Sequence, residues 1–95
     1  MIRHIVFFKI KEDYKDKVPE FAKEFRSMKG RVSELVELEI GEDFLHSPRS
    51  CDMALVATLK TREDLDAYQA NTIHVAIKTK VSACCESIAA VDYEF

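Results

Sequence analysis

Two side chains that could act on a carbonyl compound, Tyr68 and His74, lie close together in this sequence. Asn71 and Thr72 fall between them and favour a break between two helices, which would let both side chains face one cavity. A histidine near the positive end of a helix has a lowered pKa, which suits a general base near neutral pH. A tyrosine hydroxyl can donate a hydrogen bond to a developing oxyanion. The pair would suit removal of a proton next to a carbonyl.

A structural role for the same side chains is the alternative. Tyr68 could pack its ring on a sheet while His74 caps the start of a helix. His4 presents the same choice between a hydrogen-bonded core residue and a polar orienting group in a pocket, because it shares a strand face with Ile2, Val6 and Phe8. His46 lies in a turn-rich segment and is predicted to be a surface residue.

Two acidic residues, Asp52 and Asp92, lie in otherwise apolar strands. We expect them to form structural hydrogen bonds or ion pairs at a dimer edge, since a single carboxylate is a weak cation site. The adjacent Cys84 and Cys85 are poorly placed to form a disulfide with each other. Together with Cys51 they are expected to be reduced, small buried hydrophobic residues. The sequence predicts no metal and no cofactor.

Composition narrows the class of protein. With 95 residues, 47% hydrophobic and 33% charged, the chain is expected to form one soluble globular domain over residues 1–95. A net charge of -3 with scattered basic residues argues against a nucleic-acid surface. The absence of a long apolar run or a signal peptide predicts no membrane partner and a cytoplasmic location. Neither a glycine-rich phosphate loop nor a serine nucleophile elbow is present, which disfavours nucleotide chemistry and serine hydrolysis.

The elements that must position these residues follow from hydrophobic spacing. Residues 2–11, about 35–41, 51–60 and about 89–95 are predicted strands. Residues 14–29 form a predicted helix with Pro19 in its first turn and Gly30 after its end. A helix capped by Thr61 and a second helical run from Ile73 that includes Cys84, Cys85 and Ile88 precede the last strand. This order predicts an α+β, ferredoxin-like βαββαβ fold with a four-stranded antiparallel sheet.

The predicted sheet has too many apolar residues for its helices to cover. In the first and third strands both alternating sets of side chains carry apolar members, as Val6 and Phe7 illustrate. Two helices cover only one face of such a sheet, so the other face needs a second cover. A second copy packed face to face would bury it and close a barrel. The sequence therefore predicts a homodimer formed through the sheet face.

Four segments in order, residues 2–9, 52–56, 65–74 and 91–95, resemble the stress-responsive A/B barrel family, also called the Dabb or dimeric α/β-barrel family. The resemblance covers almost the whole chain. It implies a ferredoxin-like domain that dimerises into an α/β barrel and an association with stress response. Some members resemble polyketide cyclases, in which a Tyr and a His of this region promote an aldol-type ring closure. Tyr68 and His74 match those two residues, and His4 matches a further pocket histidine.

This chain departs from the cyclase-like members at two places. Met53 stands where those members carry a further histidine, and residues 71–74 read Asn-Thr-Ile-His instead of His-Pro-x-His. The resemblance thus implies a small homodimer with a pocket for a small apolar or aromatic ligand between sheet and helices, without fixing its activity. A polyketide-cyclase-like enzyme acting on a small carbonyl substrate is the alternative. A cofactor-free monooxygenase of the same architecture is a second alternative.

Overall fold

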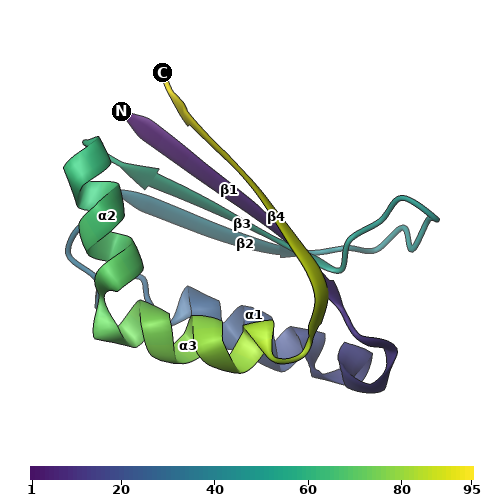
Figure 1. Cartoon of the computed structure of the whole chain (residues 1–95). Coiled ribbons are helices and arrows are strands. Elements are labelled where there is room, and N and C mark those ends of the chain that lie inside the picture. Colours follow the sequence, from purple (N-terminus) through teal and green to yellow (C-terminus); the bar gives the residue numbers. More distant parts are fainter.

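A four-stranded antiparallel sheet forms one layer of the protein, and the helices form the other (Figure 1). The computed structural model describes all 95 residues. The sheet order is β2-β3-β1-β4, which confirms the predicted ferredoxin-like α+β fold. The elements are β1 (Ile2–Ile10), the 3-10 helix η1 (Glu12–Lys17), α1 (Val18–Arg26), β2 (Glu37–Glu42), β3 (Met53–Leu59), α2 (Arg62–Ala70), α3 (Thr72–Ser82) and β4 (Cys85–Glu94).

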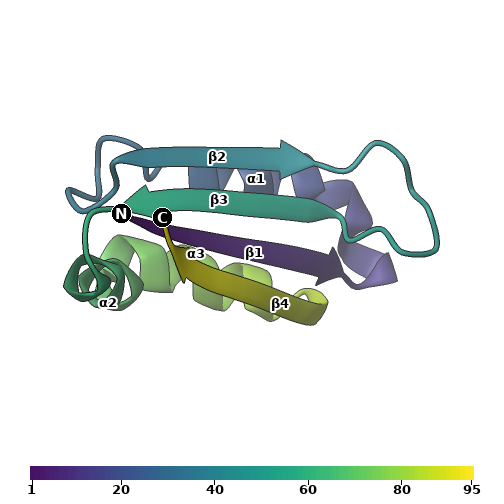
Figure 2. The same ribbon diagram turned by 90° about the horizontal axis from the view of Figure 1, so that it is seen from above.

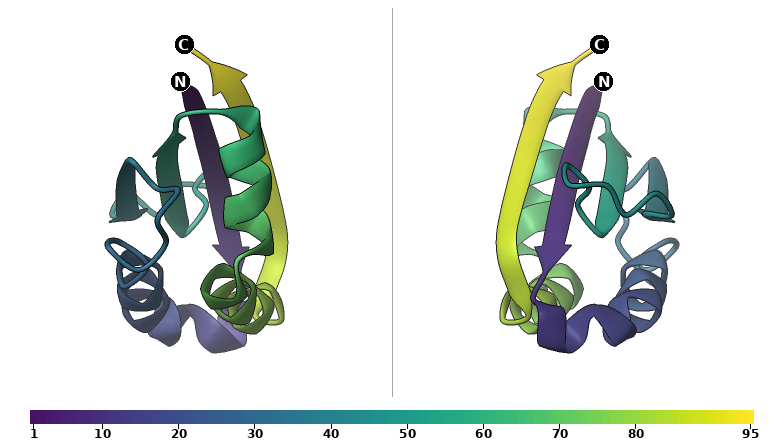
Figure 3. Two further views of the ribbon diagram at one scale, coloured as in Figure 1. Left: turned by 90° about the vertical axis from the view of Figure 1, so that its left-hand side faces the viewer. Right: turned by 90° about the vertical axis from the view of Figure 1, so that its right-hand side faces the viewer.

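The helices divide the covered face of the sheet between them. Seen from above, α1 lies behind β2 and β3, whereas α3 lies behind β1 and β4 (Figure 2). Side views show every helix on the same side of the sheet (Figure 3). None of them combines the length and apolar character that a membrane-crossing helix needs.

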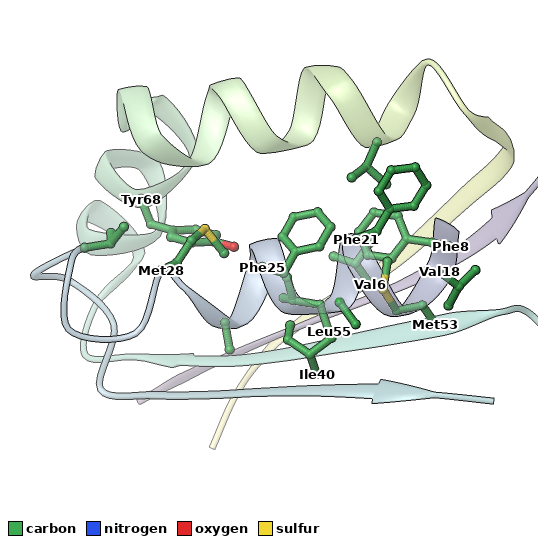
Figure 4. Packing of buried hydrophobic residues seen from close by; sticks show 14 of the residues in the cluster. Val6, Phe8, Val18, Phe21, Phe25, Met28, Ile40, Met53, Leu55 and Tyr68 are labelled. Atoms are coloured by element: carbon green, nitrogen blue, oxygen red, sulfur yellow. The ribbon is translucent and has the colours of Figure 1, made fainter. Parts of the chain in front are cut away.

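The core fills the layer between the sheet and the helices (Figure 4). Phe8 of β1 packs on Phe25 of α1, with their ring centroids 5.2 Å apart. Residues of alternating strand positions and of the inner helix faces are buried there, as their spacing predicts. The largest fully buried side chains are Tyr68, Phe21, Phe25, Ile10, Met28, Met53, Leu55, Leu59, Val32 and Val81.

The predicted break between two helices is confirmed. α2 ends at Ala70 and α3 begins at Thr72, so Asn71 is the only residue between them. Its side-chain oxygen accepts a hydrogen bond from the Ile73 amide at 2.9 Å, which caps α3. Thr61 caps α2 in the same way, by accepting from the Asp64 amide at 3.0 Å. A single capping residue therefore sets the angle between the two helices.

Two predicted boundaries were wrong. The first helix begins as the 3-10 helix η1, and α1 starts only at Val18, beside Pro19 in its first turn. The last strand begins at Cys85, four residues earlier than predicted, because α3 ends at Ser82. The apolar residues Cys84, Cys85 and Ile88 after Ser82 happen to be spaced as in a helix. Pairing with β1 makes Cys85 and Ile88 part of a strand instead.

The face of the sheet opposite the helices is open and largely apolar. Ile5 of β1 lies between Val56 of β3 and Val91 of β4 in the strand register. Phe7 of the inner strand β1 is 41% exposed and Val91 of the edge strand β4 is 55% exposed, both high values for large apolar side chains on a sheet face. This confirms that β1 presents apolar residues on both faces.

The three cysteines are free, as expected, but they are half-buried instead of fully buried. Burial raises the pKa of the Cys85 thiol to about 11, with the neighbouring Cys84 and Asp52 adding to the shift. A thiol with a raised pKa carries little thiolate near neutral pH and is a poor nucleophile.

Asp52 serves the fold, as predicted, by tying β1 to β3 and to η1. Its carboxylate accepts a hydrogen bond from the Ile10 amide at 2.7 Å and pairs with the Lys15 ammonium at 3.2 Å. Only 12% of its side chain is exposed. The carboxylate thus extends the pairing of the two strands beyond the end of their regular register.

We predict that Asp52→Ala lowers the free energy of unfolding by about 1–3 kcal/mol, because the Ile10 amide loses its partner in a largely buried position. Asp52→Asn should cost less, since the amide oxygen can still accept that hydrogen bond. Urea denaturation measures both, with the exposed Asp66→Ala as a control expected within about 0.5 kcal/mol of the parent. Equal losses for Asp52→Ala and Asp66→Ala would contradict the role given to Asp52.

Candidate functional site

A cavity of about 250 Å³ lies between the sheet and the α2–α3 pair. Most of its wall is apolar and includes Val6, Phe25 and Leu55. Such a wall with a few convergent polar groups is typical of a small-molecule site. The polar lining residues are His4, Tyr68, Gln69, His74, Lys78 and Asp92.

The structure brings the three predicted site residues together. The rings of Tyr68 and His74 lie 4.4 Å apart between centroids, at an interplanar angle of 39°. The rings of His4 and Tyr68 lie 5.9 Å apart, nearly edge to face. All three side chains are buried, and Tyr68 is fully buried. The Asn71 break produces this cluster, because it turns α3 so that His74 meets the ring of Tyr68 on α2.

The Tyr68 hydroxyl has no hydrogen-bond partner although it is buried. The side chain lies in the layer between helices and sheet, as Figure 4 shows. Burial raises the pKa of Tyr68 well above its usual value, so the hydroxyl remains protonated and can donate. An unpaired buried hydroxyl costs about 1–3 kcal/mol. A ligand oxygen placed in the cavity would supply the missing partner.

His74 is held in a neutral form. Burial is the main reason that its pKa is lowered, and the positive charges of Lys78 and His4 add to the effect, while a hydrogen bond to Gln69 opposes it. Its Nδ1 lies 3.2 Å from the Gln69 carbonyl oxygen, so Nδ1–H donates and Nε2 keeps its lone pair. The position of His74 near the start of a helix predicts the same direction, whereas burial is the leading cause of the lowered pKa.

His4 is hydrogen-bonded to Asp92 through its Nδ1 and the Asp92 Oδ1. The two residues are direct neighbours in the register of β1 and β4. With Nδ1 bound to the carboxylate, Nε2 of His4 is left for another partner.

Sequence reasoning missed three of the polar lining residues, Gln69, Lys78 and Asp92. It assigned Asp92 to a structural bond or a dimer edge, yet the structure places this carboxylate on the pocket histidine. The alternation of side chains along β4 could have predicted this position, since Ile88, Ala90 and Asp92 lie on the strand face that points to the helices. For Lys78 the signal was its position four residues after His74 on one helix face.

Other candidate residues lie away from the cavity. His46 is exposed in the β2–β3 loop, as predicted, with its ring nitrogen 3.6 Å from the Asp43 carboxylate. Met53 is buried in the hydrophobic core. Nowhere do three or more His, Cys, Asp or Glu side chains gather in a group that could hold a metal ion.

The fold and the site define an α+β protein with an apolar pocket that contains a hydroxyl donor and two imidazoles. The stress responsive A/B barrel domain pattern matches residues 2–95, so the chain belongs to that family. The resemblance noted in the sequence is thereby confirmed. None of the curated proteins matches this chain significantly.

Several solved structures share the fold. A dimeric protein of unknown function with a ferredoxin-like fold from Bacteroides fragilis is 27% identical, with a TM-score of 0.86 over 99% of this chain and 95% of that one. A dimeric ferredoxin-like protein of unknown function from Thermobifida fusca is 24% identical, with a TM-score of 0.88 over 99% and 90%. A hydroxynitrile lyase from Passiflora edulis is 19% identical, with a TM-score of 0.82 over 97% and 90%.

We predict that Lys78→Gln raises the pKa of His74, because a nearby positive charge that opposes protonation of the ring is removed. The pKa should move back toward the ordinary value of about 6.5 without reaching it, since burial still acts. Histidine ring signals followed by NMR across pH measure the change. Lys80→Gln is the matched control, because Lys80 pairs with Glu24 at 3.0 Å and should leave His74 unchanged. If the pKa of His74 is unchanged in Lys78→Gln, the Lys78 ammonium lies too far from the ring to affect it.

Proposed function

We propose that this protein binds a small, largely apolar carbonyl compound in the cavity and catalyses proton transfer at the carbon next to the carbonyl. The observation that carries the proposal is the buried Tyr68 hydroxyl, which lacks a partner and stacks beside a neutral histidine. A hydroxyl that only supported the fold would be expected to have a hydrogen-bond partner. Its free donor capacity suits a substrate oxygen.

In this proposal Tyr68 donates a hydrogen bond to the carbonyl oxygen. The bond becomes stronger as that oxygen gains negative charge, so it stabilises an enolate more than the ketone. The raised pKa of Tyr68 keeps the proton on the phenol throughout. The apolar wall excludes water and strengthens the interaction.

The two imidazoles take different roles because their partners differ. His74, kept neutral by burial, removes the proton through Nε2, while the Gln69 carbonyl holds the ring orientation. His4 is hydrogen-bonded to Asp92, which fixes its ring, so it orients the substrate. In this step the carbon–hydrogen bond breaks, its proton moves to Nε2 of His74, and its electron pair forms the enolate. A polyketide-cyclase-like ring closure would use such an enolate.

We further propose that the protein is a homodimer formed through the open sheet face. The apolar residues Ile5, Phe7 and Val91 need a cover that the helices do not provide. The structures from Bacteroides fragilis and Thermobifida fusca, which are described as dimeric, support the proposal. The pocket and the open face lie on opposite sides of the sheet, so dimerisation leaves the pocket available. The cofactor-free monooxygenase alternative stays a prediction. Two solved structures named as antibiotic biosynthesis monooxygenases share the fold, at 20% and 16% identity, but a shared fold does not assign their reaction to this pocket.

We predict that Tyr68→Phe separates catalysis from stability. The variant should fold with equal or slightly higher stability, because the lost hydroxyl has no hydrogen-bond partner. It should slow exchange of the methyl protons of acetophenone in heavy water by roughly 100-fold to 1,000-fold, as expected when one oxyanion donor is lost. NMR measures the exchange and thermal unfolding the stability. Wild-type protein with no exchange above buffer would refute the proposed reaction.

Val91→Asp is predicted to dissociate the dimer, since it places a charge on the open face, directly beside Ile5 in the register of β1 and β4. Val75→Asp is a matched control, because Val75 is also an exposed valine, at 44% against 55% for Val91, but lies on α3. Sedimentation velocity over a range of concentrations should show a dimer for the parent and the control, and a monomer or aggregate for Val91→Asp. A parent that remains monomeric at high concentration would rule out the proposed dimer.

A further inference from the structure

Lys78 is the one charged group of the cavity lining that has no partner. Asp92 is paired with His4, whereas Lys78 forms neither an ion pair nor a hydrogen bond. Lys80, two residues further on, is engaged with Glu24. The proposed reaction assigns no role to the Lys78 ammonium.

The helix places Lys78 one turn away from His74. It lies one turn after His74 on the same face of α3, which corresponds to a rise of about 6 Å. Its side chain is exposed, so the ammonium lies where the cavity meets solvent. The lowering of the His74 pKa by the Lys78 charge agrees with this proximity.

We propose that the substrate is an anionic carbonyl compound, whose carboxylate binds Lys78 while its carbonyl oxygen lies at Tyr68. This inference rests on the proposed function, because it takes the position of the carbonyl from that reaction. An aromatic ring that bears both groups is a compact compound of this class. The apolar wall, which includes Val6, Phe25 and Leu55, would surround that ring.

The charges around the pocket favour an anion over a cation. The carboxylate of Asp92 is already engaged by a hydrogen bond with His4. Glu24 is likewise occupied, by Lys80. A cationic substrate would bring a second positive charge next to Lys78 and would find no free carboxylate in the lining.

The test compares two ligands of the same shape, 4-acetylbenzoate and the neutral 4-acetylbenzamide. Wild-type protein should bind the carboxylate up to about fivefold more tightly than the amide, the range expected for a solvent-exposed ion pair. Lys78→Gln should abolish this preference, and Lys80→Gln should retain it. Dissociation constants come from NMR titrations at two salt concentrations, and the preference should shrink at the higher one.

Each outcome is informative. Equal binding of both ligands to the wild type, or a preference that persists in Lys78→Gln, would overturn the role of Lys78. If Lys78 has no such role but the Tyr68→Phe substitution still weakens binding of 4-acetylbenzamide, the proposed function stands without this inference. If the wild type binds neither ligand, both proposals fail.

Discussion

The central position of β1 governs both surfaces of the sheet. This strand is paired with β3 on one side and β4 on the other, so its alternating side chains are fixed by two registers at once. One set, which includes His4 and Val6, faces the helices and forms the floor of the pocket. The other set, which includes Ile5 and Phe7, faces away from them. A shift of β1 by one residue against both neighbours would exchange the two sets and remove the pocket and the open face together.

The site contains two features that a purely structural core would avoid. A hydroxyl lies buried without a partner at Tyr68, and the imidazole of His74 is kept from its charged form. Both features lower the free energy of unfolding. The cost of keeping His74 neutral grows as the pH falls below the ordinary histidine pKa of about 6.5. They lie beside α2 and α3, whose junction is a single residue. Local stability given up at a cluster of polar groups is common where a protein binds a ligand.

The sequence was most informative where the chain makes local choices. Asn71 as a break, Thr61 as a cap and the two apolar sets of β1 could be read from spacing alone, since each depends on near neighbours. The start of β4 could not, because Cys84 and Cys85 fit a helical stripe and only pairing with β1 decides between strand and helix. Asp92 was missed for the same reason: its contact with His4 exists only through the register of two strands far apart in the chain.

The two ends of the chain meet where β1 begins and β4 ends, at the same end of the sheet. The Met1 amino group lies 3.3 Å from the Phe95 carbonyl oxygen, and the ribbon shows both termini side by side (Figure 1). The four strands could therefore keep their order in a chain whose ends lie at another point of the sequence. A short linker could join the present ends, and new ends could be opened in the exposed β2–β3 loop. Such a circular permutant would keep β1, β4 and both helices of the pocket in one uninterrupted segment.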